Sequence, residues 1–243
     1  TKTRCGMNDR NALAAMNVSG NIMIDNDIKS TAKTNNPKFR VLLGITGSIA
    51  AVKGPELAVR LVKELGFEVK VLLTRGGSNF WGKAKDYDRK HWDELQSMIL
   101  SSNEDDGDKK VVIYSYDDEW KDYTQIGDSV LHIDLRNWAN MIVIAPLSAH
   151  TMAKIANGLC DDTLSCVVRA WDYTKPIILA PAMNTAMWKH PITQHQIQTI
   201  CGFGSSSKIS IVEPIVKKLA CGEIGQGALA TIDDIIKVIK EKI

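Results

Sequence analysis

Small and hydroxylated residues follow four apolar runs of this sequence, at the point where each run ends. They occur in Gly44-Ile-Thr-Gly-Ser-Ile-Ala-Ala51, Thr74-Arg-Gly-Gly-Ser78, Pro146-Leu-Ser-Ala-His-Thr151 and Ala180-Pro-Ala-Met-Asn184. Backbone N–H groups and hydroxyls at such turns bind anionic groups, phosphate above all. The first segment is neither a G-x-G-x-x-G fingerprint nor a P-loop, and alone it fits a tight turn nearly as well. Four such ends together favour a phosphorylated, planar cofactor.

Three further polar side chains, His132, Asn184 and Cys221, are of types that occur both in active sites and in purely structural positions. An imidazole exchanges protons near neutral pH, whereas an amide adds no charge. Cys221 opens the glycine-rich segment 221–227, where we expect an exposed thiol rather than a packed one. Taken alone, His132 fits a structural histidine better, and Asn184 fits the cap of a following helix as well as a ligand contact.

Cys160 and Cys166, together with His150, invite comparison with a zinc site. Their spacing does not fit and a fourth ligand is missing. We therefore expect no metal and predict that both cysteines are core thiols.

The elements that must position these residues follow from the apolar pattern. Continuous apolar runs are typical of strands buried on both faces of a parallel sheet, and they occur at Arg40–Thr46, Phe67–Thr74, Val111–Tyr116, Met141–Pro146, Pro176–Pro181 and Ile209–Val212. Helices are predicted at Ala50–Leu65 and Thr231–Lys242, where apolar residues recur at helical spacing. Alternating strands and helices predict an α/β fold with an open, doubly wound parallel sheet, which binds ligands beyond the carboxyl ends of its strands.

The chain divides into three kinds of sequence. Residues 1–36 are rich in Asn, Asp, Lys, Ser and Thr, and we predict a disordered tail there. Residues 37–243 are expected to form a single domain. Within it, the charged stretch at about 82–110 is interpreted as a solvated insertion with a short helix at His91–Leu100, rather than as a partner-binding acidic loop.

Composition limits the function classes. Thirty basic and 28 acidic residues give a formal charge of +2, so nothing favours nucleic acid or a membrane surface over a small-molecule substrate. Five cysteines at irregular spacing, with no signal peptide and no apolar run of about 18 residues, predict a cytoplasmic protein with free thiols.

Five motifs in this order resemble the homo-oligomeric flavin-containing cysteine decarboxylases, the family of phosphopantothenoylcysteine decarboxylase and the plant halotolerance flavoproteins. The motifs are Gly47-Ser-Ile-Ala-Ala51, Leu131-His-Ile-Asp-Leu135, Ala145-Pro-Leu-Ser148, Pro181-Ala-Met-Asn-Thr-Ala-Met-Trp188 and Leu219-Ala-Cys-Gly222. The resemblance covers Phe39 to the C-terminus without the charged insertion. It implies a Rossmann-like (flavodoxin-like) flavoprotein, FMN as cofactor, and a trimer-based homo-oligomer with FMN at the subunit contact.

The resemblance also implies roles for individual residues. His132 matches the proton acceptor, Cys221 the proton donor and Asn184 the substrate clamp, while the substrate flap matches Lys218, Leu219 and Ala220. The FMN site matches Gly47, Ser48, Ile49, Thr74, Arg75, Gly76, Ser148, Ala149, His150, Thr151 and Ala182.

Two residues depart from the family pattern. His150 stands where Asn is common, near the flavin phosphate, and Asn137 stands where a second Arg is common. The second departure puts a contact to the substrate carboxylate in doubt, with Arg136 or Lys53 as substitutes.

The reaction that the resemblance implies is a step of coenzyme A synthesis. Phosphopantothenoylcysteine becomes phosphopantetheine through oxidation of the thiol to a thioaldehyde, loss of CO2 and reduction of the enethiol. The alternative is a regulatory subunit of the halotolerance type that inhibits a protein phosphatase. Peptidyl-cysteine decarboxylases and flavin prenyltransferases share the fold, but the Pro-Ala-Met-Asn and Leu-Ala-Cys-Gly motifs favour the pantothenoyl substrate.

Overall fold

A computed structural model describes residues 38–100, 111–205, 207–218 and 224–243. The predicted N-terminal tail lies outside these residues. So do Leu219 and Ala220 of the predicted flap, the predicted proton donor Cys221 and part of the predicted insertion.

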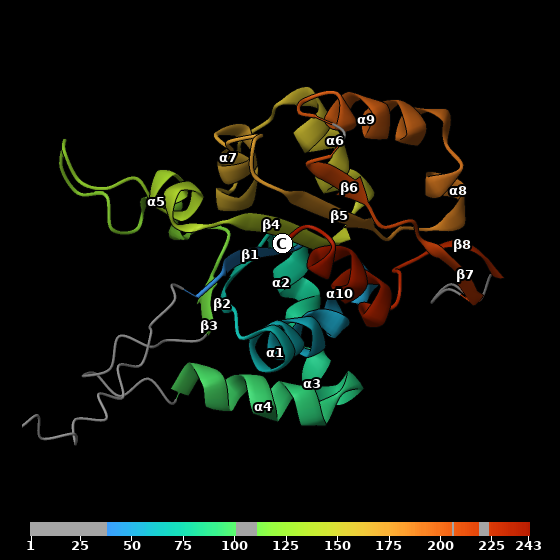
Figure 1. The fold of residues 1–243 in the computed structure, drawn as a ribbon, viewed down its shortest axis with the longest axis horizontal. Helices are drawn as coiled ribbons and strands as arrows, with labels where there is room; N and C mark the ends of the chain where they lie inside the picture. The colour runs from blue at the N-terminus through green and yellow to red at the C-terminus, as the bar shows by residue number, and fades with distance from the viewer. Residues whose placement is uncertain (1–37, 101–110, 206, 219–223) are drawn as a thin grey trace, which may run out of the picture. The chain divides into compact units, whose positions relative to one another are not determined.

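Among the described residues, six parallel strands form the central sheet in the order β3-β2-β1-β4-β5-β6 (Figure 1). Their bounds are β1 (Arg40–Ile45), β2 (Glu68–Leu73), β3 (Val111–Tyr114), β4 (Met141–Leu147), β5 (Ile177–Pro181) and β6 (Ile209–Ile211). This is the Rossmann order, and the chain reverses direction across the sheet between β1 and β4. The predicted doubly wound parallel sheet is confirmed.

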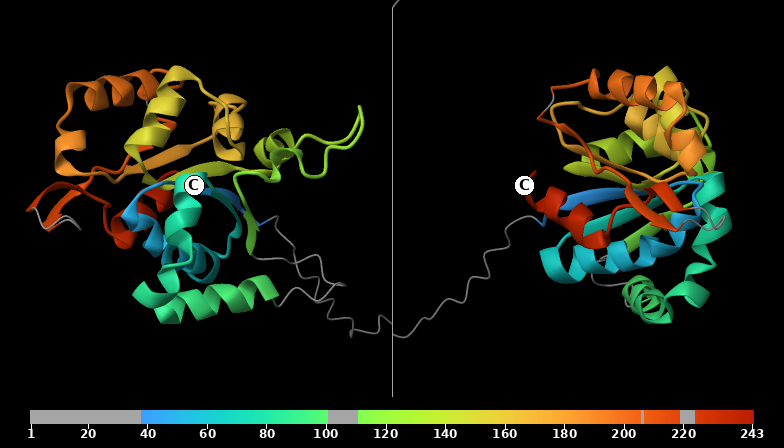
Figure 2. Two further views of the ribbon diagram at one scale, coloured as in Figure 1. Left: turned by 180° about the vertical axis from the view of Figure 1, so that it is seen from behind. Right: turned by 90° about the vertical axis from the view of Figure 1, so that its right-hand side faces the viewer.

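Helices cover both faces of the sheet, because successive strand residues point to opposite sides. In β1, Val41 and Leu43 pack among α1 and α10, whereas Leu42 packs among α6 and α7. Figures 1 and 2 show α1 (Gly54–Leu65), α4 (Arg89–Leu100) and α10 (Ile232–Lys240) on one face. The other face carries α5 (Leu131–Trp138), α6 (Ala149–Asn157), α7 (Thr163–Arg169) and α9 (Pro191–Cys201).

The predicted helix at Ala50–Leu65 consists of two parts. A 3₁₀ helix, η1 (Ile49–Lys53), leads into α1, whose first turn holds Pro55 and which ends at Gly66 in the left-handed conformation (φ 70°). The last predicted helix is confirmed as α10, and its four inward isoleucines are buried: Ile232, Ile235, Ile236 and Ile239.

The described part of the charged insertion is packed on the domain. It forms α3 (Ala84–Tyr87) and α4, and the predicted short helix begins at Arg89. Leu95 is fully buried, the Trp92 ring contacts Trp81 edge-on, and Glu94 pairs with Lys63 of α1 at 2.9 Å. Residues 82–100 therefore belong to the hydrophobic core as well as to the surface.

The prediction that both cysteines are core thiols is wrong for Cys160, which is exposed in the turn between α6 and α7. Cys166 is half-buried, and this burial raises the pKa of its thiol to about 11. Within the described ranges no helix has the length and apolarity needed to cross a membrane.

Candidate functional site

A cavity of about 450 Å³ opens at the carboxyl ends of β1, β4 and β5, at the topological switch point. This volume is within the range of about 300–1,000 Å³ that cofactor sites occupy. The cavity is lined by these predicted site residues: Gly47, Ser48, Ile49, Ser148, Ala149, His150, Ala182 and Asn184.

Thr46 joins the two strand ends that form the floor of the site. Its fully buried hydroxyl donates to the Pro146 carbonyl at 2.7 Å and accepts from the Ser148 N–H at 2.7 Å. Ser148 in turn caps α6, because its hydroxyl accepts from the Thr151 N–H at 3.3 Å. Ala149 and His150 of the first turn of α6 line the cavity, and the N–H groups of such a turn have no partner within their helix.

The remaining predicted flavin residues lie behind the cavity wall. Thr74 caps α2 (Arg75–Trp81) and accepts from the Gly77 N–H at 3.1 Å, while the Thr74 N–H donates to the Ile45 carbonyl. Gly76 is in backbone contact with Gly47. These residues, with Thr151, hold the lining loops in place rather than line the cavity. Arg75 is exposed and its guanidinium lies 5.1 Å from the Tyr116 ring.

Asn184 does two things in this structure. It lines the cavity and also caps α8 (Thr185–Trp188), accepting from the Ala186 N–H at 2.7 Å. The helix-cap interpretation of Asn184 is confirmed, and its place in the cavity keeps the substrate interpretation open.

A two-stranded hairpin, β7 (Ile215–Lys218) and β8 (Ile224–Ala228), closes the side of the cavity next to Asn184. Gly227 has φ 147°, and a Cβ there would lie 2.3 Å from the Met183 carbonyl oxygen, so only glycine lets the hairpin approach this closely. The Met183 N–H donates to the Gly227 carbonyl at 2.9 Å. Lys218 lies in β7, next to Lys217, which lines the cavity.

Two lysines, Lys53 and Lys217, give the cavity a positive wall. Burial lowers the pKa of Lys53, and the positive charge of Lys217 lowers it further. Such a pair favours an anionic ligand. The sequence suggested Lys53 or Arg136 as a contact for the substrate carboxylate, and Lys53 lines the cavity. Arg136 instead donates to the Ala170 carbonyl at 2.9 Å and to Asn137 at 2.8 Å, so its role in substrate binding stays a prediction.

Apolar side chains complete the wall, and they were not predicted from the sequence. Phe80 and Tyr87 come from the segment around α2 and α3, and Met183 and Met187 flank Asn184. The flat aromatic rings and the flexible methionine side chains both suit contact with a planar ring. The charged sequence around Tyr87 gave no sign that this residue lines a ligand site.

His132 lies away from this cavity. It is in the first turn of α5, where its Nδ1 is in very close contact with the buried Glu119 carboxylate. Figures 1 and 2 show α5 at one end of the sheet, and α8 with the β7–β8 hairpin at the other. A single chain therefore does not bring His132 to Asn184.

Comparison with known proteins assigns residues 29–243 to the family described as Flavoprotein. The chain belongs to the flavoprotein family. The phosphopantothenoylcysteine decarboxylase HAL3 of Malus domestica is 42% identical over 204 residues, which cover 84% of this chain and 83% of that relative. The phosphopantothenoylcysteine decarboxylase of Mus musculus is 40% identical over 203 residues, covering 84% and 86%.

Solved structures of flavoprotein relatives have the same fold. A cysteine-to-serine mutant of PPC decarboxylase, complexed with pantothenoylaminoethenethiol, matches with a TM-score of 0.69 at 41% identity and covers 84% of this chain and 97% of that chain. The FMN binding protein AtHal3 matches with a TM-score of 0.66 at 41% identity, covering 84% and 96%. The resemblance drawn from the motifs and the Rossmann-like fold class are both confirmed.

Proposed function

We propose that this flavoprotein is an FMN-dependent decarboxylase that converts phosphopantothenoylcysteine to phosphopantetheine in coenzyme A biosynthesis. The observation that carries the proposal is the cavity at the switch point. It combines an anion-binding helix start, a positive wall and the Asn184 amide in one site. The names of the relatives at 40–46% identity support the same reaction.

The residues of the cavity fit FMN. The capped N-terminus of α6, with Ser48 opposite it, suits a phosphate, because free N–H groups and the helix dipole favour negative charge. Phe80, Met183 and Met187 offer apolar surface for a planar ring system. When bound, FMN supplies the redox chemistry that makes loss of CO2 possible.

The side chains of the chain bind and orient the substrate in this proposal. Lys53 and Lys217 attract its anionic groups, and Asn184 clamps the carboxylate and amide without adding charge. His132 accepts a proton near the carboxylate, and Cys221 is the proton donor, although the latter lies outside the described residues.

The distance between α5 and the cavity leads us to propose a homo-oligomer, in which His132 serves a neighbouring subunit. Exposed apolar side chains occur on α5 and on the segment that precedes it: Ile126 is 99% exposed and Trp120 62%, and Tyr123 and Ile133 are also open to solvent. Such a surface suits contact with a second copy. A trimer with FMN at the contact is the assembly that we propose.

The experiment is turnover by the FMN-loaded protein. The purified chain is reconstituted with FMN, its native mass is measured, and CO2 and phosphopantetheine are quantified after addition of phosphopantothenoylcysteine. We expect stoichiometric formation of both products by an assembly larger than a monomer. A flavin-loaded oligomer without turnover would refute the enzyme and favour the regulatory, phosphatase-inhibiting alternative, with which the HAL3 name of the apple relative agrees.

A further inference from the structure

We propose that Glu119 is a positioning residue for His132: its carboxylate fixes the proton of the imidazole on Nδ1 and leaves Nε2 as the proton acceptor. This inference rests on the proposed function, because it assigns a task to the side chain that orients the base.

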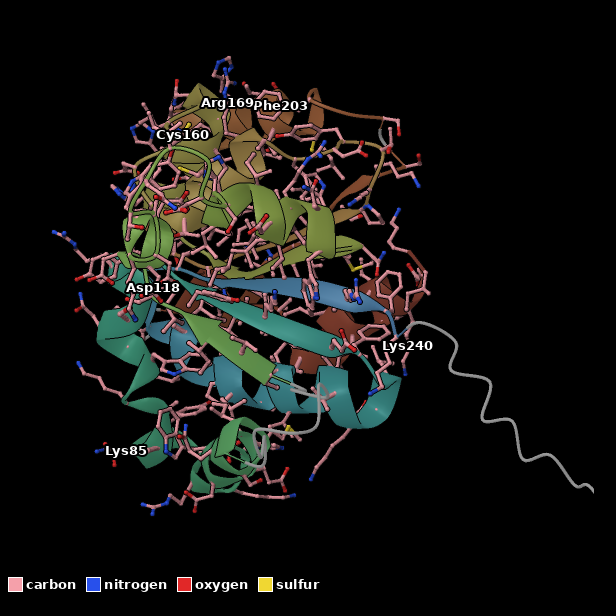
Figure 3. All side chains as sticks on the ribbon, turned by 90° about the vertical axis from the view of Figure 1, so that its left-hand side faces the viewer. Lys85, Asp118, Cys160, Arg169, Phe203 and Lys240 are labelled. Carbon is pink, nitrogen blue, oxygen red and sulfur yellow. The ribbon has the colours of Figure 1, made fainter. Side chains whose placement is uncertain are left out.

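Glu119 comes from a different element than His132. It lies in the short helix η2 (Asp118–Trp120), which packs against the start of α5, and the two residues are 13 positions apart. Figure 3 views the molecule from this side and labels Asp118, the neighbour of Glu119 in η2. The carboxylate is 6% exposed and the imidazole 21% exposed, so the acid is covered while the ring keeps an open edge.

The contact determines which tautomer the ring adopts. An ionised carboxylate only accepts hydrogen bonds, so the nitrogen that meets Glu119 Oε1 must carry a proton. The neutral ring then has its lone pair on Nε2. This is the arrangement in which a histidine accepts a proton while a buried carboxylate stabilises the resulting cation.

A purely structural role explains Glu119 poorly. Its second oxygen, Oε2, is buried and has no hydrogen-bond partner among the described residues. A buried carboxylate with so few partners costs stability, because its desolvation is compensated only in part. A side chain with this cost is better explained by what it does to His132.

The other described carboxylate–histidine pair on this chain is different in kind. Asp88 Oδ2 contacts the ring Nδ1 of His91 at 2.6 Å, but Asp88 Oδ1 also accepts from the backbone N–H of His91 at 3.2 Å, at the start of α4. Both side chains are more than a fifth exposed. This pair caps a helix and does not line the cavity, so it provides a matched control.

The first measurement is made on the FMN-loaded wild-type protein with ¹⁵N-labelled histidine, by two-bond nitrogen–proton correlation. We expect the His132 signals to show the Nδ1–H tautomer at neutral pH. Glu119→Gln should remove the preference for the Nδ1–H tautomer, because an amide can either accept from or donate to His132 Nδ1. An Nε2–H tautomer in the wild-type protein would overturn the proposal, and this result does not depend on turnover.

The second measurement is kinetic. Glu119→Gln is expected to lower kcat by about 100-fold or more, the order found when an orienting carboxylate is replaced, with little change in KM. Asp88→Asn should retain wild-type kcat. An unchanged kcat in folded, flavin-loaded Glu119→Gln would refute the positioning role. Absence of turnover in the wild type would refute the proposed function, while the tautomer would still decide the role of Glu119.

Discussion

Gly76 and Gly47 bring the first two strand ends into backbone contact. A Cβ added to Gly76 would lie 2.7 Å from the Cα of Gly47, closer than side-chain carbons approach backbone atoms. Since Gly47 lines the cavity and Gly76 does not, the second glycine acts by letting the loop after β1 lie against α2. The shape of the flavin site thus depends on a residue behind its wall.

Gly76→Ala is expected to weaken both the fold and flavin binding. The added methyl group must push the two loops apart, with a cost of about 1–3 kcal/mol in the free energy of unfolding. Urea unfolding and titration of flavin fluorescence measure the two effects. Gly82→Ala is the matched control, because Gly82 has φ −64° and nothing within 4 Å of its Cβ position. Wild-type flavin affinity in Gly76→Ala would contradict this account.

Lys53 makes substrate binding depend on pH. Burial, and then the charge of Lys217, lowers its pKa in the free protein. A bound anion favours the protonated form, so affinity is full below this lowered pKa and weakens as the pH rises through it. Folding stability changes in the opposite direction. The unfolded chain binds more protons between the lowered and the ordinary lysine pKa, so this group's contribution rises with pH there.

The measurement for Lys53 is KM for phosphopantothenoylcysteine from neutral pH to the ordinary titration range of lysine. Lys53→Met should raise KM at neutral pH by about tenfold or more and flatten this part of its pH dependence. Lys85→Met is the control, because Lys85 is exposed on α3 (Figure 3) and is not among the residues that line the cavity. A pH dependence that survives in Lys53→Met would assign it to another group.

The sequence predicts one side of the site better than the other, for a physical reason. Strands buried on both faces are continuous apolar runs, so the loops after β1, β4 and β5 follow from their pattern. The wall that contains Tyr87 depends on tertiary packing of a charged segment. The next helix in this segment, α4, does have an apolar face, with Trp92, Leu95 and Ile99 at helical spacing. The charged residues between them make this pattern hard to recognise in the sequence. No local signal joins Glu119 to His132, because their contact forms only when η2 folds against α5.

Residues 82–100 contribute both to the cavity wall, through Tyr87, and to the hydrophobic core, through Leu95. Tyr87 is 57% exposed at the cavity wall, so Tyr87→Ala should leave unfolding nearly unchanged and reduce ligand affinity. Leu95 is fully buried, and Leu95→Ala should lower the free energy of unfolding by about 2–5 kcal/mol. Urea unfolding and KM measured on both variants test this. Equal stability of Leu95→Ala and wild type would restore the interpretation of the segment as a solvated insertion.

Asn184 both caps α8 and lines the cavity, and one substitution can test these two roles separately. Asp caps helices about as well as Asn, so Asn184→Asp should keep the stability of the wild type. It also places a negative charge in a cavity that we expect to hold anions, and KM should rise by about tenfold or more.

Thr231→Ala is the control, and it should lower stability while leaving KM unchanged. Thr231 caps α10 by accepting from the Asp234 N–H at 3.1 Å and does not line the cavity. Its loss should cost about 1 kcal/mol of stability without changing KM. If Asn184→Asp has wild-type KM, Asn184 is a cap alone and the substrate must be clamped by other groups.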